Sequence, residues 1–128
     1  MLLACNLFLI YLIYHQGAKM TKESGASCSV FSLKNFVGYQ KESVVSKEII
    51  KKRSGTVTLF AFDAGQGLSE HTAPFDALVV VVDGTAEITI SGKKFTVRSG
   101  EAIIMPANQK HALYARKAFK MALIMIRA

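Results

Sequence analysis

Residues 65–84, GQGLSEHTAPFDALVVVVDG, decide how this chain folds. The glycines near the start predict a turn, and the pair Asp83-Gly84 is a strong turn signal at the other end. Between them, the apolar run 77–82 has no polar face, so we predict a strand that is buried on both sides. His71 stands where the first turn gives way to this strand, at the edge of an apolar core.

Short β-rich segments continue in both directions from this stretch. Residues 85–91 alternate cleanly between apolar and polar side chains, and Pro106 interrupts pairing and introduces a loop. One helical turn is expected over 32–36, capped by Ser32. Further strands are predicted over 43–50, 56–64, 93–97, 101–105, 111–115 and 119–126. Many short strands between glycine turns, without a long internal repeat, indicate an all-β barrel or sandwich.

The composition is typical of a compact globular protein with a basic surface. The chain has 128 residues, 51% of them hydrophobic, and a formal net charge of +7. This length suffices for one domain with a single core. The basic residues are scattered rather than arranged in a stripe with aromatic residues between them, so we expect no nucleic-acid binding. A solvated basic face, or a preference for small anionic ligands, explains the charge better.

The two cysteines, Cys5 and Cys28, cannot form a disulfide framework, and neither lies near a histidine in a metal-ligand spacing. Such sparse use of cysteine is typical of a reducing compartment. We therefore predict that both thiols are inert and that the protein is cytoplasmic.

Residues 1–20 differ from the rest of the chain. An almost continuous apolar run of thirteen residues, from Leu2 to Tyr14, is too short to span a bilayer comfortably, and no positively charged region precedes it. We predict that translation begins at Met20, that residues 1–20 are a non-native or weakly hydrophobic extension, and that the domain occupies residues 21–128. A weak membrane anchor is the alternative; the prediction we favour has no membrane partner.

The order of glycines, histidines and proline resembles the cupin superfamily. The first cupin motif is G-x5-H-x-H-x3-4-E-x6-G, and the second is G-x5-P-x-G-x2-H-x3-N. Both spacings are kept here, and the likeness extends over about residues 29–127. Six positions match the motifs: Gly65, His71, Gly84, Gly100, Pro106 and His111. Four positions depart from them: Ala73, Ala77, Asn108 and Ala115.

The resemblance implies an all-β fold, a single-domain jelly-roll barrel that is commonly a homodimer. It also implies a divalent metal (zinc, iron, nickel or manganese) held by the histidines and the glutamate of the motifs. Only His71 and His111 remain as ligands, because Ala73 and Ala77 replace the other two. Two imidazoles alone would hold a metal weakly, since catalytic zinc sites typically keep three protein ligands.

The alternation of side chains along a regular strand predicts the lining of a pocket. Residues 71, 73, 75 and 77 would share one face, as would residues 111, 113 and 115, while Glu70, Asp76 and Tyr114 would point away. A turn at Pro74 would break this alternation. The predicted pocket is apolar with two polar points, which is typical of a small-molecule site. Its residues are His71, Ala73, Phe75, Ala77, His111, Leu113 and Ala115.

Three functions are compatible with this pattern, and no spacing identifies catalytic residues. We favour a module that binds a small molecule through a reduced two-histidine site. The second possibility is an enzyme, either a metal-dependent dioxygenase or isomerase that uses His71 and His111, or a metal-free acid–base catalyst. The third is a dimerising scaffold, in which each histidine is simply a hydrogen-bonded core residue.

Overall fold

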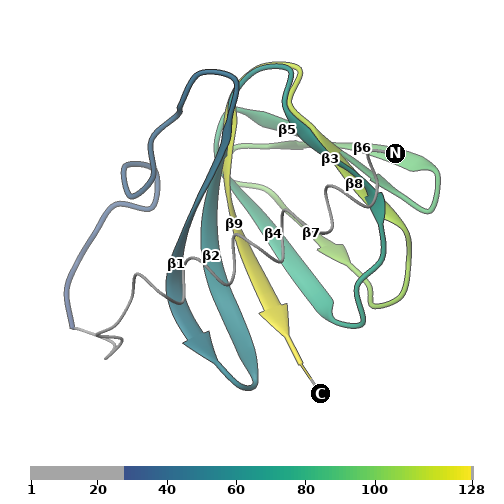
Figure 1. Cartoon of the computed structure of the whole chain (residues 1–128), viewed down its shortest axis with the longest axis horizontal. Helices are drawn as coiled ribbons and strands as arrows, with labels where there is room; N and C mark the ends of the chain where they lie inside the picture. The colour runs from purple at the N-terminus through teal and green to yellow at the C-terminus, as the bar shows by residue number, and fades with distance from the viewer. Residues whose placement is uncertain (1–27, 128) are drawn as a thin grey trace.

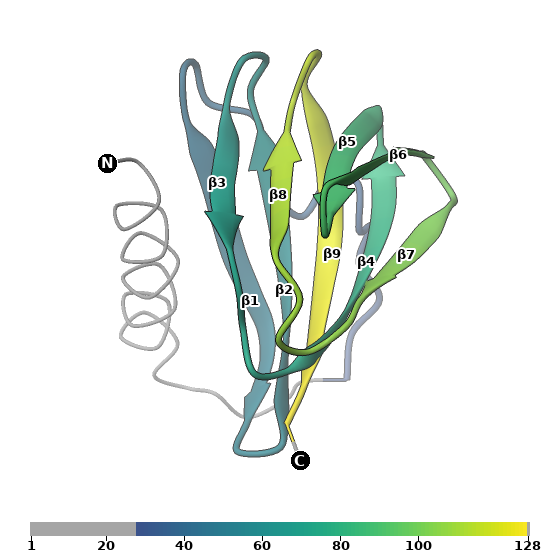
Figure 2. The same cartoon turned by 90° about the vertical axis from the view of Figure 1, so that its right-hand side faces the viewer.

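The computed structural model describes residues 28–127, which form two antiparallel sheets that face each other (Figures 1 and 2). One sheet has the order β1-β2-β9-β4-β7, and the other has the order β3-β8-β5-β6. The strands are β1 Val44–Lys52, β2 Gly55–Phe62, β3 Gly67–His71, β4 Asp76–Asp83, β5 Thr85–Ile90, β6 Lys93–Arg98, β7 Ala102–Met105, β8 His111–Tyr114 and β9 Phe119–Ile126. The predicted all-β jelly-roll fold is confirmed.

Some sequence predictions concern residues that lie outside the described range. The proposed extension over 1–20, its possible role as an anchor and the thiol of Cys5 all belong there. Cys28 is exposed and free. Among residues 28–127, no helix has the length and apolar character needed to cross a bilayer. The structure contains a single chain, so the homodimer stays a prediction.

One strand was missed by the sequence prediction, and its position corrects the expected alternation. Residues 67–71 form β3, which pairs with β8, whereas Ala77 lies on β4 in the opposite sheet. The chain crosses from one sheet to the other around Pro74, which lacks the N–H that a strand would use. Residues 71–81 therefore do not form one regular strand. The helical turn predicted over 32–36 is a simple turn, in which the Ser32 Oγ accepts a hydrogen bond from the Asn35 N–H at 3.2 Å.

The main core lies between the two sheets. The inward residues of β2 and β9 pair directly, and the rings of Phe62 and Phe119 stack with centroids 4.6 Å apart. Val79 and Val81 on β4 are fully buried against them. Burial of such large side chains supplies most of the stabilisation, roughly 1.5–3 kcal/mol for each aliphatic or aromatic residue.

The outer face of the five-stranded sheet is covered over only part of its area. Phe36 and Val37 pack on outward residues of β2 and β9 and form a second apolar cluster. Farther along β4, however, Leu78 is 36% exposed. The prediction that this strand is buried on both sides is therefore correct for its inner face and wrong for Leu78.

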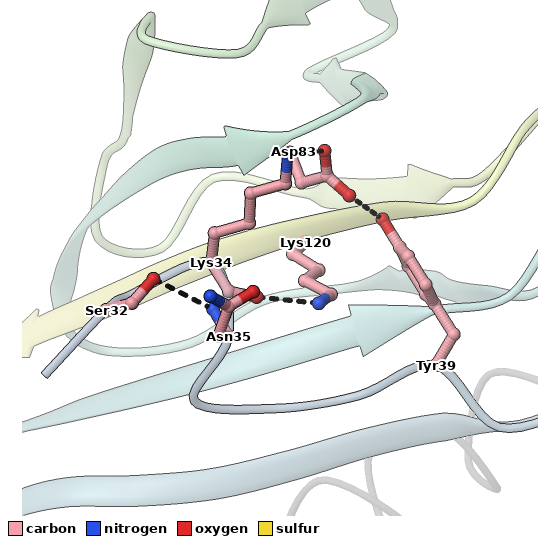
Figure 3. A network of polar contacts seen from close by, with 6 residues as sticks. All are labelled: Ser32, Lys34, Asn35, Tyr39, Asp83 and Lys120. Carbon is pink, nitrogen blue, oxygen red and sulfur yellow. Dashed lines mark hydrogen bonds and ion pairs between the residues drawn. The ribbon is translucent and has the colours of Figure 1, made fainter.

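Polar contacts fasten the segment before β1 to this outer face (Figure 3). The Tyr39 hydroxyl donates a hydrogen bond to Asp83 Oδ2 at 2.6 Å, and Lys120 Nζ donates to the Lys34 carbonyl oxygen at 2.6 Å. The Lys120 ammonium also lies 4.8 Å from the centre of the Tyr39 ring. Burial and the hydrogen bond to Asp83 raise the pKa of the Tyr39 hydroxyl, so it remains a donor over the physiological range.

The glycines of the two motifs have a backbone role that explains why their spacing is kept. Gly65, Gly84 and Gly100 have φ values of 86°, 74° and 89°, in the left-handed region that other residues rarely adopt. Asn108 stands at the motif position that cupins fill with glycine, and its φ is 66°. Asparagine tolerates this left-handed backbone better than most other residues that carry a side chain.

We expect Gly84→Ala to destabilise the fold more than Gly100→Ala. Both substitutions force a left-handed alanine, which costs about 1–2 kcal/mol. At Gly84, the added Cβ would also lie 2.5 Å from the Ala118 carbonyl oxygen, whereas at Gly100 it would meet no atom within 4 Å. Urea unfolding of the two variants measures the difference. Equal losses would show that the contact with Ala118 is relieved without cost.

Candidate functional site

A cavity of about 570 Å³ lies between the sheets, at the end where β3 finishes and β8 begins. This end is at the bottom of Figure 2, with the β1–β2 hairpin and the crossing from β3 to β4. Most of the lining is apolar, and Thr72 adds a hydroxyl. The lining residues are Lys51, Phe60, Leu68, His71, Thr72, Ala73, Pro74, Phe75, Ala77, Met105, His111, Leu113, Met121, Leu123, Met125 and Arg127.

The two motif histidines are direct neighbours on paired strands. His71 ends β3 and His111 begins β8, and the two residues are partners in the antiparallel register. Their rings meet edge to face, with centroids 4.4 Å apart and an interplanar angle of 70°. Only 8% of His71 and 6% of His111 is exposed to solvent. The fold therefore brings together two imidazoles that are forty residues apart in the sequence.

Backbone carbonyl groups fix the tautomer of both imidazole rings in their neutral state. His71 Nδ1 lies 2.6 Å from the Ser69 carbonyl oxygen, and His111 Nδ1 lies 3.1 Å from the Gln109 carbonyl oxygen. A carbonyl oxygen only accepts, so each Nδ1 carries the hydrogen and donates it. Each Nε2 then keeps its lone pair and has no hydrogen-bond partner among residues 28–127. The site thus offers two nitrogen acceptors to whatever occupies the cavity.

The environment favours the neutral form of His111. Burial lowers the pKa of its imidazole below the ordinary value of 6.5, and the charge of a protonated His71 lowers it further. The hydrogen bond to the Gln109 carbonyl oxygen acts in the opposite direction but is the smallest of the three effects. At neutral pH, His111 is therefore an uncharged acceptor.

The described residues do not supply the ligand set of a tightly held metal. Within residues 28–127, no group of three or more histidine, cysteine, aspartate or glutamate side chains lies close enough to share an ion. Ala73 and Ala77 line the cavity without a donor atom. Glu70 and Asp76 are exposed and outside the lining, and Asp76 Oδ1 accepts a hydrogen bond from the Ala107 N–H. The two Nε2 atoms would be half of a four-ligand site.

Six of the seven residues predicted for the pocket are found in the lining. They are His71, Ala73, Phe75, Ala77, His111 and Leu113. The seventh, Ala115, follows β8 and is fully buried in the main core. It does not line the cavity, contrary to the prediction. The side chains of β8 alternate as expected, but the cavity does not extend as far as Ala115.

The sequence prediction missed the part of the lining that comes from β1, β2 and β9. Met121, Leu123 and Met125 alternate along β9, a signal that places them on one face. Periodicity does not show where a core ends and a cavity begins, so the sequence alone does not separate these residues from residues of the core. Lys51 and Arg127, the two charged residues of the lining, carried no sequence signal.

We expect a pH titration of the His111 Cε1–H signal by NMR to give a pKa below 6.5, and His71→Phe to raise it. Phenylalanine keeps an apolar ring against His111 but cannot be protonated, so only the charge effect is removed. Because folding lowers this pKa, the unfolded chain takes up a proton first, and His111 costs stability as the pH falls below about 6.5. An unchanged pKa in the variant would show that the charge of His71 has no effect.

Comparison with known proteins agrees with the geometry of the fold. A family model for the cupin domain matches residues 58–127. A conserved protein of unknown function from Streptococcus pyogenes, SPY1581, superposes with a TM-score of 0.76 at 34% identity, over 80% of this chain and 90% of that one. A Cupin 2 conserved barrel domain protein from Leptotrichia buccalis gives a TM-score of 0.73 at 40% identity, over 76% of this chain and 47% of that one.

Among curated proteins, "Polyketide synthase CurC" from Streptomyces cyaneus is 30% identical over 59 residues. The match covers 45% of this chain and 38% of the length of that relative. Since the family model spans more than half of the sequence and includes the second motif, this chain belongs to the cupin domain family.

Proposed function

We propose that this cupin binds a small, largely apolar organic molecule in the cavity between its sheets. The observation that carries the proposal is the pair of buried imidazoles, whose Nδ1 atoms are engaged by the backbone and whose Nε2 atoms are left to a ligand. Such a combination of an apolar lining with a few convergent polar groups is typical of small-molecule sites.

The size and chemistry of the cavity support this proposal. A volume of about 570 Å³ lies in the usual range of ligand pockets, roughly 300–1,000 Å³. Ala73 and Ala77 contribute to this space, because each has only a methyl group where the family motif has a larger side chain. A ligand with an O–H or N–H group directed at the histidines would satisfy the two Nε2 acceptors, which would otherwise lose hydrogen bonds to water on binding.

The alternative is a metal-dependent enzyme, and two observations favour it. Histidines that bind a metal through Nε2 usually donate Nδ1–H to a carbonyl or carboxylate oxygen, and His71 and His111 have this arrangement. The likeness to a relative named as a polyketide synthase also favours an enzyme, although this chain covers 38% of its length. With two donors, a metal would depend on solvent or on the ligand itself for its remaining coordination.

We expect the neutral fluorescent probe N-phenyl-1-naphthylamine to bind saturably, with a rise in emission on entering the apolar cavity. Ala77→Phe should weaken this binding by about tenfold or more, because the added ring fills the space beside the histidines. Ala112→Phe is the matched control, since Ala112 lies on β8 between two lining residues and outside the lining itself. The absence of saturable binding, or equal losses in both variants, would contradict the proposal.

We expect elemental analysis to find well below one zinc, iron, nickel or manganese ion per chain in protein purified without an affinity tag or chelator. The double variant Ala73→His/Ala77→Glu restores the four donors of the family motif and should approach one ion per chain. Adding His71→Ala to that variant should remove the ion again. Near-stoichiometric metal in the unmodified protein, lost on His71→Ala, would instead support the enzyme.

A further inference from the structure

The charged residues that line the cavity all have one sign. Among the sixteen lining residues, Lys51 and Arg127 are permanently cationic, the two histidines are neutral or cationic, and none is acidic. Lys51 and Arg127 are exposed residues, so their charges lie where the cavity opens to solvent. A water-filled mouth with two cations attracts small anions and repels cations.

A β-bulge directs Lys51 to this mouth. Before the bulge, Glu48 pairs with Thr58, and after it Ile50 pairs with Val57 and Lys51 with Thr56. Thr56 and Thr58 share a face of β2 with the core residue Phe60, so their partners face inward as well. If the pairing continued regularly from Glu48 without a bulge, Ile50 would pair with Thr56 and point inward, and Lys51 would point outward. A shift of one residue exchanges the two faces of a strand.

Arg127 reaches the same mouth from the end of β9. Met125, two residues earlier, pairs with Thr56, which in turn pairs with Lys51, and Arg127 lines the cavity together with Met125 and Lys51. The Arg127 N–H donates a hydrogen bond to the Ser54 carbonyl oxygen at 2.8 Å, which fixes the backbone against the β1–β2 hairpin. The guanidinium lies 5.0 Å from the centre of the Phe75 ring, a cation–π contact that orients it over the opening.

Neither cation forms an ion pair with another residue of 28–127. The ion pairs of the described residues join Lys34 to Asp83, and Lys94 and Arg116 to Glu87. Glu48 is the acidic residue whose charge acts on Lys51, but its two carboxylate oxygens are occluded and have no hydrogen-bond partner. Burial raises the pKa of Glu48 above its ordinary value, and the charge of Lys51 acts in the opposite direction.

We propose that the ligand of the cavity is an organic carboxylate, with its anionic group between Lys51 and Arg127 at the mouth, its apolar body along the methionines, and a donor group where it reaches the histidines. This inference rests on the proposed function, because it assigns a chemical class to the molecule in the same cavity. The bulge in β1 acts as the specificity element, since it alone turns a lysine to the inner face of that strand.

A matched pair of probes tests the charge and the cavity separately. Naphthalene-2-carboxylate and naphthalene-2-carboxamide have nearly the same shape and differ in charge, and isothermal titration calorimetry measures both. We expect the carboxylate to bind the unmodified protein about tenfold more tightly than the carboxamide, as one charge-assisted contact provides. Lys51→Ala should reduce this preference, because the carboxylate loses more affinity than the carboxamide while Arg127 remains. Glu48→Gln should strengthen carboxylate binding, because it removes the neighbouring negative charge.

Lys52→Ala is the control, because Lys52 is adjacent in the sequence, equally charged, exposed and outside the lining. It should leave both affinities unchanged, and thermal unfolding should show that all three variants remain folded. Equal affinities of the two probes, or equal losses in Lys51→Ala and Lys52→Ala, would overturn the carboxylate assignment while leaving the cavity as a binding site. Failure of both probes to bind would overturn the proposed function itself.

Discussion

The pairing of β9 with β2 on one side and β4 on the other is the constraint on which the two-layer structure depends. This pairing puts every second residue of β9 between the sheets, beside the inward residues of its neighbours. At one end, Phe119 stacks on Phe62 and fills the interior. At the other end, Met125 lies between Thr56 and Ala77, whose side chains are small. The same alternation therefore produces a solid core and, farther along the same strands, a cavity.

The histidine pair shows how the fold gives chemistry to that cavity. The register of β3 with β8 places His71 opposite His111, and two local carbonyl oxygens hold the hydrogens on Nδ1. A ligand that displaces water from these acceptors without offering a donor leaves them unpaired, which is costly. The two Nε2 atoms therefore favour ligands with donors, whereas the loss of two motif donors at Ala73 and Ala77 reduces the capacity to retain a metal.

Charge adds a second level of selection at the mouth. The interior is apolar, and His111 is neutral near pH 7. Neither the apolar lining nor His111 therefore provides the attraction for an anion. Lys51 and Arg127 provide the attraction, and both owe their position to backbone features: a bulge in β1 and a hydrogen bond from the end of β9 to the β1–β2 hairpin. The affinity of such a site would come from the apolar cavity, and its selectivity from the cations.

The sequence by itself determined the family, eight of the nine strands and six of the sixteen residues that line the cavity, because these depend on local rules. Gly65, Gly84 and Gly100 mark backbone that must be left-handed, and alternation marks the inward side chains. Only the tertiary structure decided that β3 belongs to the second sheet, that Ala115 lies in the core, and that Lys51 faces the cavity. Each of these depends on which strands pair and in which register. Residues 47–52 of β1, KEIIKK, are compatible with either face inward, and the pairing of β1 with β2 is what places the bulge.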